Sequence, residues 1–359
     1  MIIPVTQPFL PPMEEYNNRI AKLWGSKWLT NNGVFVRELE DELASYLEVT
    51  SLSFVGNGTL ALQLALKALD IKGEVITTPF SFVATTTAII WENCEPVFVD
   101  IDSETLCIDA DKIEEVITKK TTAILATHVY GIPCNVERIE EIAKKHGLKV
   151  IYDAAHAFGV KYKGKSILEY GDISTLSFHA TKLFHTVEGG GIVTNLGPEM
   201  DKQIKLLRSF GFEDECYKMV GINAKNSEFH AAMGLCNLKY IDQIMEKRKV
   251  IADTYDARLL KHFVRPSISK SVDYNYAYYP IIFETEQELV AVKEALDKKN
   301  IQARRYFYPT LNELPYLQSY YPCFNSEDIS NRVLCLPLYS DLNIKDVERI
   351  IDLVLGELK

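Results

Sequence analysis

A lysine and an aspartate, each at the end of a β-like run, have side chains that could act in one reaction. Lys182 closes the segment SFHATK at residues 177–182, and a lysine in its neutral form can bond covalently to a carbonyl carbon. Asp153 follows the apolar run at residues 150–152, where its carboxylate could hold a protonated ring nitrogen. Both have plainer explanations, because most lysines are solvated surface charges and an aspartate here could cap a helix.

Two further segments lie between an expected strand and an expected helix. In GNGT, residues 56–59, Gly58 lets the backbone approach a ligand, and the helix that starts near Thr59 offers free N–H groups to a phosphate. In FSFVAT, residues 80–85, Phe82 could stack on a planar ring. The alternatives are a tight turn for the first segment and core filling for the second.

Together these features are more specific than any one of them. A phosphate-binding turn, a stacking aromatic, an acid for a pyridine nitrogen and a lysine, in that order, are what pyridoxal 5′-phosphate (PLP) requires. The sequence therefore indicates a PLP site, formed by residues that lie far apart along the chain.

The elements that must position these residues follow a βαβα rhythm from about residue 50 to residue 200. Short β-rich runs alternate with helical patterns, which indicates a mostly parallel sheet covered on both faces. Ligands of such sheets bind beyond the carboxyl ends of the strands. Farther along, helices are expected over residues 228–260 and a strand over residues 275–283. We predict a large α/β domain at residues 1–240, with an N-terminal arm, and a small α+β domain at residues 241–359.

The composition excludes several classes of protein. Of the 359 residues, 47% are hydrophobic and 25% are charged, as in globular proteins, and the net charge of −10 argues against a general binder of nucleic acid or membrane surfaces. No apolar run is long enough to span a membrane, and the N-terminus does not resemble a signal peptide. The seven cysteines never form a CxxC pair, which indicates reduced thiols in the cytoplasm and no zinc site.

The sequence resembles the DegT/DnrJ/EryC1/StrS family of sugar aminotransferases over nearly its whole length. The resemblance is carried by the segments WLTNNG (28–33), GNGTLAL (56–62), PFSFVAT (79–85), YDAAHA (152–157), SFHATK (177–182), EGG (188–190) and GINAK (221–225), with Glu228 and AAMG (231–234). It implies an α/β fold of type I, the aspartate-aminotransferase type, and PLP as cofactor.

The resemblance also implies roles for individual residues. Lys182 would form the imine with PLP and move protons, and Asn223 would reach the cofactor phosphate of a neighbouring subunit, so that a homodimer would share its active sites. The other cofactor contacts implied are Gly58, Thr59 and Ser177 for the phosphate, Phe82 stacked on the ring, Asp153 on the ring nitrogen and His156 near the ring hydroxyl.

The implied reaction moves an amino group from L-glutamate, which leaves as 2-oxoglutarate, to a nucleotide-linked keto-sugar. The segment SFHATK and the opening of the chain resemble relatives that aminate C-4 of dTDP-4-keto-6-deoxyglucose to give dTDP-4-amino-4,6-dideoxyglucose, for bacterial O-antigen and other surface glycans. The alternatives are amination at C-3 of a dTDP-3-keto-6-deoxy-hexose and PLP-dependent dehydration of a sugar. One departure from the family is Val187, where many relatives have glycine.

Residues that contact the sugar nucleotide are harder to assign. We name Thr30, Arg304 and Tyr308 as candidates. The basic pair Arg304-Arg305 could bind a diphosphate or could be part of a solvated loop.

Overall fold

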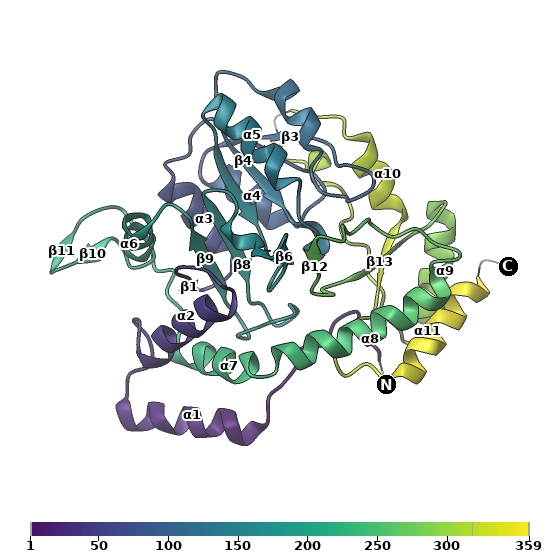
Figure 1. The fold of residues 1–359 in the computed structure, drawn as a ribbon, viewed down its shortest axis with the longest axis horizontal. Helices are drawn as coiled ribbons and strands as arrows, with labels where there is room; N and C mark the ends of the chain where they lie inside the picture. The colour runs from purple at the N-terminus through teal and green to yellow at the C-terminus, as the bar shows by residue number, and fades with distance from the viewer. Residues whose placement is uncertain (1, 318, 358–359) are drawn as a thin grey trace.

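A seven-stranded mixed sheet forms the centre of the protein, as a computed structural model describes it for residues 2–317 and 319–357 (Figure 1). Four of its six strand pairings are parallel, and β9 runs antiparallel to both of its neighbours. The predicted mostly parallel sheet is therefore confirmed. In spatial order the strands are β1 (Ser53–Val55), β9 (Gly190–Thr194), β8 (Ile173–Ser177), β5 (Lys149–Asp153), β4 (Thr121–Thr127), β2 (Glu74–Thr77) and β3 (Glu95–Phe98).

Helices cover the sheet and extend the molecule on one side (Figure 1). Helix α5 shows why the local sequence folds as it does: the Asn135 side chain caps its first turn by accepting a hydrogen bond from the Arg138 N–H, and Gly147 ends it at a φ of 67°. The helices are α1 (Met13–Ser26), α2 (Val34–Tyr46), α3 (Gly58–Ala68), α4 (Val83–Trp91), α5 (Val136–His146), α6 (Pro198–Leu207), α7 (Glu228–Leu238), α8 (Ile241–Leu259), α9 (Glu286–Lys298), α10 (Phe324–Arg332) and α11 (Ile344–Gly356).

Short elements complete the chain. The hairpin of β10 and β11 projects from the body beside α6 (Figure 1). The short strands are β6 (Lys161–Tyr162), β7 (Lys165–Ser166), β10 (Phe212–Glu213), β11 (Cys216–Tyr217), β12 (Val272–Asp273), β13 (Tyr279–Ile282) and β14 (Val333–Leu336), and the 3₁₀ turns are η1 (Ala110–Val116), η2 (Val129–Gly131), η3 (Ile167–Glu169) and η4 (Leu311–Glu313).

Two expected elements are shorter than the sequence suggested. The helical stretch at 228–260 is interrupted between α7 and α8, at residues 239–240. The strand expected at 275–283 is reduced to β13, because the Asn275 side chain donates hydrogen bonds to the carbonyl oxygens of His156 and Phe158 and ties that segment to the loop after β5.

The buried residues form separate apolar clusters. One cluster joins α8, α9 and α11 to β13 and β14, and includes Ile3 from the N-terminal segment. Two other clusters pack on the seven-stranded sheet, and the larger of these also includes Ile244 of α8 and Phe307. The domain boundary at residue 240 stays a prediction.

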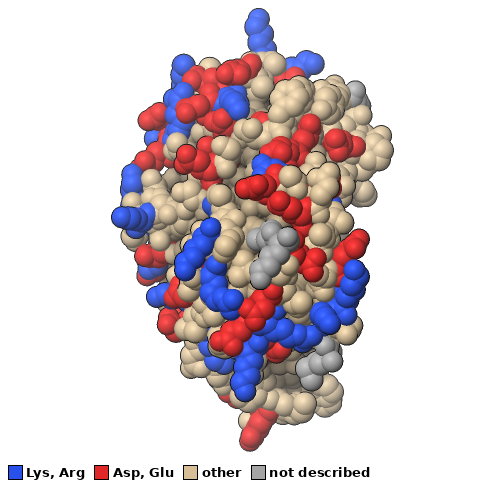
Figure 2. All heavy atoms as spheres, turned by 90° about the vertical axis from the view of Figure 1, so that its right-hand side faces the viewer, with Lys and Arg blue, Asp and Glu red and all other residues tan. Residues whose placement is uncertain are grey.

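The face on the right-hand side of Figure 1 carries Lys, Arg, Asp and Glu side chains intermixed, so no large area of one charge forms there (Figure 2). Within residues 2–317 and 319–357, no helix is both long and apolar enough to cross a membrane.

Candidate active site

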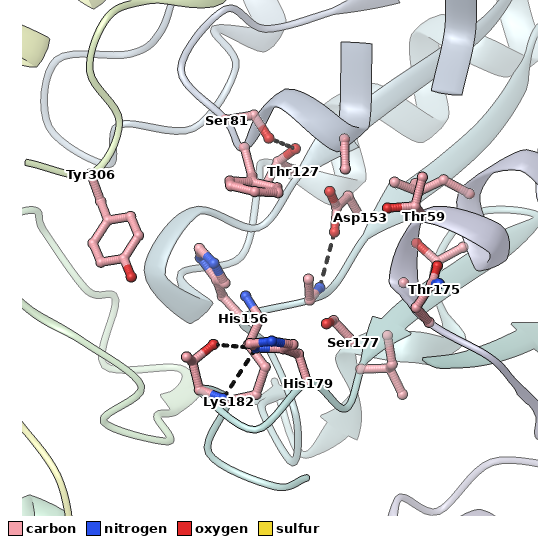
Figure 3. Close-up of a pocket in the computed structure, with 18 of the residues that line it drawn as sticks. Thr59, Ser81, Thr127, Asp153, His156, Thr175, Ser177, His179, Lys182 and Tyr306 are labelled. Carbon is pink, nitrogen blue, oxygen red and sulfur yellow. Dashed lines mark hydrogen bonds between the residues drawn. The ribbon is translucent and has the colours of Figure 1, made fainter. Parts of the chain in front are cut away.

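A cavity of about 410 Å³ opens at the carboxyl ends of parallel strands β4, β5 and β8. This is the edge at which a doubly wound sheet binds its ligands, and the volume suits a cofactor. Figure 3 shows side chains from these strand ends converging on one space, with Tyr306 facing them from a separate segment of the chain. The predicted residues that line the cavity are Gly58, Thr59, Phe82, Asp153, His156, Ser177, Lys182 and Arg304.

The turn before α3 forms one wall of the cavity. The Asn57 side chain accepts a hydrogen bond of 2.9 Å from the Leu60 N–H, while the N–H groups of Gly58 and Thr59 have no acceptor among the described residues. Gly58 packs so closely that an added Cβ would lie 3.0 Å from the Cβ of Ser177. The wall therefore combines unpaired N–H groups, a helix N-terminus and the Ser177 hydroxyl, which together suit a phosphate.

The Asp153 carboxylate is buried at the end of β5 and is held on both oxygens. The Thr85 hydroxyl donates to Oδ2 at 2.7 Å, and the Ala155 N–H donates to Oδ1 at 3.1 Å. Ser81 links Thr85 to Thr127 through hydroxyl contacts of 2.8 and 2.9 Å. Burial raises the pKa of Asp153, and the Thr85 hydrogen bond acts in the opposite direction.

The Lys182 amine faces the cavity from the loop after β8. The turn is closed by a hydrogen bond of 2.8 Å from the Lys182 N–H to the His179 carbonyl. Burial lowers the pKa of Lys182 to about 8, the Asp153 charge raises it, and the Arg304 charge lowers it further. The amine forms no hydrogen bond or ion pair with any described residue, so a large fraction of it is neutral at moderately alkaline pH.

His156 lies in the loop after β5 and is packed among aromatic rings. Its imidazole is nearly parallel to the ring of Phe307, with 5.7 Å between centroids, and contacts Tyr278 at 4.5 Å. The Tyr130 N–H donates to its Nδ1 at 3.2 Å. Burial lowers the pKa of His156 well below its usual value, so the ring is neutral and carries its proton on Nε2.

The structure separates the two phenylalanines before α4. Phe80 is completely buried and packs against Tyr130 and Phe307, as the core-filling interpretation expected of an aromatic here. Phe82 precedes α4, lines the cavity and remains 51% exposed. Its ring is therefore available to a ligand.

Three predicted residues do not line this cavity. Thr30 lies exposed in the loop before α2, and the exposed Asn223 accepts a hydrogen bond of 2.8 Å from the Lys225 amine. The half-exposed Tyr308 ring lies 3.5 Å below the guanidinium carbon of Arg305. Their predicted roles stay predictions.

Several residues of the site were not singled out from the sequence. The spacing of Ser81, in the bend before α4, and Thr85, in its first turn, was a signal, because two hydroxyls four residues apart can hydrogen-bond across the start of a helix. No local pattern marked the others, which come from distant segments: Thr127, Tyr278, Tyr306 and Phe307.

The donor set fits PLP. The unpaired N–H groups of Gly58 and Thr59 suit its phosphate, Asp153 suits a pyridinium nitrogen, and the unpartnered amine of Lys182 suits its aldehyde. When Ser177, Phe82 and His156 are added, seven of the predicted cofactor residues, with five chemical functions, line one cavity.

The comparisons with known proteins agree with this geometry. Residues 12–355 match the DegT/DnrJ/EryC1/StrS aminotransferase family. The chain is 44% identical to the dTDP-4-amino-4,6-dideoxy-D-glucose transaminase of Escherichia coli, over 99% of both chains.

Solved structures show the same fold. DesI in the presence of its TDP-sugar product superposes with a TM-score of 0.94 and 31% identity, over 100% of this chain and 93% of DesI. The PLP form of Spr1654 from Streptococcus pneumoniae superposes with a TM-score of 0.90 and 25% identity, over 100% of both chains. This chain therefore has the fold-type-I architecture and belongs to the DegT/DnrJ/EryC1/StrS aminotransferase family.

Proposed function

We propose that this protein is a PLP-dependent aminotransferase that moves the amino group of L-glutamate to C-4 of dTDP-4-keto-6-deoxyglucose. The observation that carries the proposal is that the Lys182 amine and the Asp153 carboxylate line one cavity, beside the N-terminus of α3. The 44% identity to a dTDP-4-amino-4,6-dideoxy-D-glucose transaminase supports the choice of sugar and of carbon.

Bound PLP supplies a protonated ring that accepts the electron pair left when a C–H bond beside an amine is broken. The protein does the remaining work. Gly58 and Thr59 hold the phosphate, and Asp153 keeps the ring nitrogen protonated. Lys182, with its lowered pKa, takes the proton from the donor carbon and later delivers a proton to the sugar carbon.

The first test of this function is an absorbance titration of the PLP-loaded protein with dTDP-4-amino-4,6-dideoxyglucose. We expect this amino sugar to convert the cofactor's visible absorbance, and we expect the 3-amino isomer to leave it unchanged. Conversion by the 3-amino isomer alone would move the reaction to C-3.

Dehydration of a keto-sugar is the alternative reaction on the same cofactor. It predicts sugar turnover that does not consume L-glutamate. We expect instead one 2-oxoglutarate for each amino sugar formed. A PLP-saturated wild-type protein with the same absorbance as the Lys182→Ala variant, and so without an imine, would exclude the aminotransferase.

We also propose a homodimer with shared active sites. Asn223 is exposed and lies outside its own cavity, where it is available to a second subunit. Large apolar side chains are exposed on α1 and the following loop, among them Trp24 at 68% and Trp28 at 56%. Sedimentation should show a dimer, and mixing Asn223→Ala with Lys182→Ala subunits should restore activity in hybrids.

The setting of the reaction belongs to the proposal as well. All seven cysteines are free thiols, as suits the reducing cytoplasm. The product would be an amino sugar precursor for O-antigen or another bacterial surface glycan. Loss of one 4-amino-4,6-dideoxyhexose from the surface glycan of a strain lacking this protein would test that assignment.

A further inference from the structure

Adjacent arginines at the mouth of the cavity have different environments. The Arg305 guanidinium pairs with Glu286 at 2.8 Å and donates to the Asn331 carbonyl at 3.2 Å, near the end of α10. Arg304 has no carboxylate within ion-pairing distance among the described residues. The contacts of Arg305 therefore stabilise the fold, whereas Arg304 lines the cavity.

Two contacts hold Arg304 in place without neutralising it. Its backbone is fixed by a pair of hydrogen bonds with Cys335 of β14, of 3.0 and 2.8 Å. Its guanidinium carbon lies 4.4 Å from the centroid of the Tyr306 ring, so the cation rests on an aromatic face. A guanidinium held in this way keeps its N–H donors for an anion.

The other charged groups of the cavity do not compete for this cation. The Asp153 carboxylate is held by Thr85 and Ala155. Glu188 lies 3.6 Å from Nε2 of His179. Because the protein has a net charge of −10, its overall field repels anions, and an unpaired arginine at the site can attract and orient an anionic reactant locally.

Both substrates of the proposed reaction carry oxyanions, and their chemistry separates them. In a sugar that reacts at C-4, the diphosphate on C-1 lies across the ring from the reacting carbon. In an α-amino acid, a carboxylate is bonded to the carbon that bears the amine. Arg304 lines the same cavity as the Lys182 amine, and its charge acts on the pKa of that amine, so it lies on the reacting side.

We infer that Arg304 is the carboxylate receptor for the amino donor, and that it determines the preference for an acidic donor. The inference rests on the proposed function. It predicts different consequences for the two adjacent arginines. Removing the Arg304 charge should weaken binding of the amino donor, whereas removing the Arg305 charge should lower the stability of the fold.

The test compares Arg304→Gln with the matched control Arg305→Gln, both as PLP-loaded proteins. Calorimetry measures the dissociation constants of glutarate, a dicarboxylate without an amine, and of dTDP. For Arg304→Gln we expect glutarate to bind about 10- to 100-fold more weakly, the range for a lost charge-assisted hydrogen bond, and dTDP to bind within about 2-fold of wild type. Arg305→Gln should bind both normally and melt at a lower temperature.

Single-turnover absorbance measurements then separate the two half-reactions. We expect kcat/KM for L-glutamate to fall in Arg304→Gln while the value for dTDP-4-amino-4,6-dideoxyglucose is retained, with Arg304→Lys in between. Weaker dTDP binding with normal glutarate binding would overturn the inference and assign Arg304 to the diphosphate. Unchanged binding of both, or no glutarate binding by the wild type, would also overturn it. A wild type that does not react with glutamate at all would instead contradict the proposed function.

Discussion

The Tyr130 backbone N–H donates a hydrogen bond to Nδ1 of His156 at 3.2 Å, and this contact fixes which nitrogen of a buried imidazole carries the proton. Tyr130 adopts a φ of 56°, a left-handed conformation that places this N–H. The other ring nitrogen, Nε2, is left as a donor for a ligand in the cavity.

Two substitutions separate the two nitrogens of His156. In His156→Asn the side-chain oxygen can replace the Nδ1 acceptor, but the donor at Nε2 is lost, so we expect PLP to bind about 10-fold more weakly, the effect of about one hydrogen bond. Equilibrium dialysis measures this. His156→Gln should do the reverse, keeping a donor while the Tyr130 N–H loses its acceptor, and should lower the free energy of unfolding by about 1–3 kcal/mol. Equal PLP affinities in the two variants would contradict the assignment.

The Lys182 amine should titrate at an unusually low pH. Burial lowers its pKa from 10.5 to about 8, so the protonated form dominates below pH 8 and the reactive neutral form above it. In the PLP-free protein, an amine-reactive reagent should modify Lys182 at a rate that rises with pH and has its midpoint near pH 8. Peptide mass spectrometry measures this rate. Exposed Lys202 provides the internal control, because its hydrogen bond with Glu213 raises the pKa of its amine, so its rate should keep rising at higher pH. A midpoint near 10 for Lys182 would show that the amine is not perturbed.

Val187 adopts a φ of 72°, a conformation that suits glycine and strains a β-branched residue. Its side chain is 44% exposed, so little packing is lost on its removal. We expect Val187→Gly to raise the free energy of unfolding by about 0.5–1 kcal/mol, because relief of about 1–2 kcal/mol of strain exceeds the entropic cost of glycine. Val250, 48% exposed inside α8, is the matched control, and Val250→Gly should be destabilising. Denaturant unfolding at one protein concentration decides between these outcomes.

A buried ion pair supports the strand that leads into the phosphate wall. Arg208 pairs with Glu40, and the Phe54 N–H of β1 donates to the same carboxylate at 2.7 Å. We expect Arg208→Met to lower the free energy of unfolding by about 3–5 kcal/mol, because it leaves a buried charge without its partner. The double variant Glu40→Met/Arg208→Met should be more stable than Arg208→Met alone, which thermal melting can show. A single variant as stable as wild type would mean that water reaches Glu40.

The sequence by itself determined the local chemistry and the class of fold. Helix α5 lies between the cap residues Asn135 and Gly147, and helix α9 begins after the cap residue Thr285, because capping signals act over a few residues. The order of Gly58, Phe82, Asp153 and Lys182 on a βαβα chain indicated PLP, and the carboxyl ends of parallel strands bring such residues to one edge of the sheet.

Tertiary structure alone decided between neighbours of the same type. Phe80 and Phe82 are two residues apart, yet one is core and one is in the site, and Arg304 and Arg305 differ in the same way. The adjacent side chains of Arg304 and Arg305 point to opposite sides of an extended segment, whereas Phe80 and Phe82 are separated by the bend before α4. In both cases, what each side chain meets depends on packing between distant segments. Contacts such as Tyr278 against His156 join residues more than a hundred positions apart, so no local pattern could have predicted them.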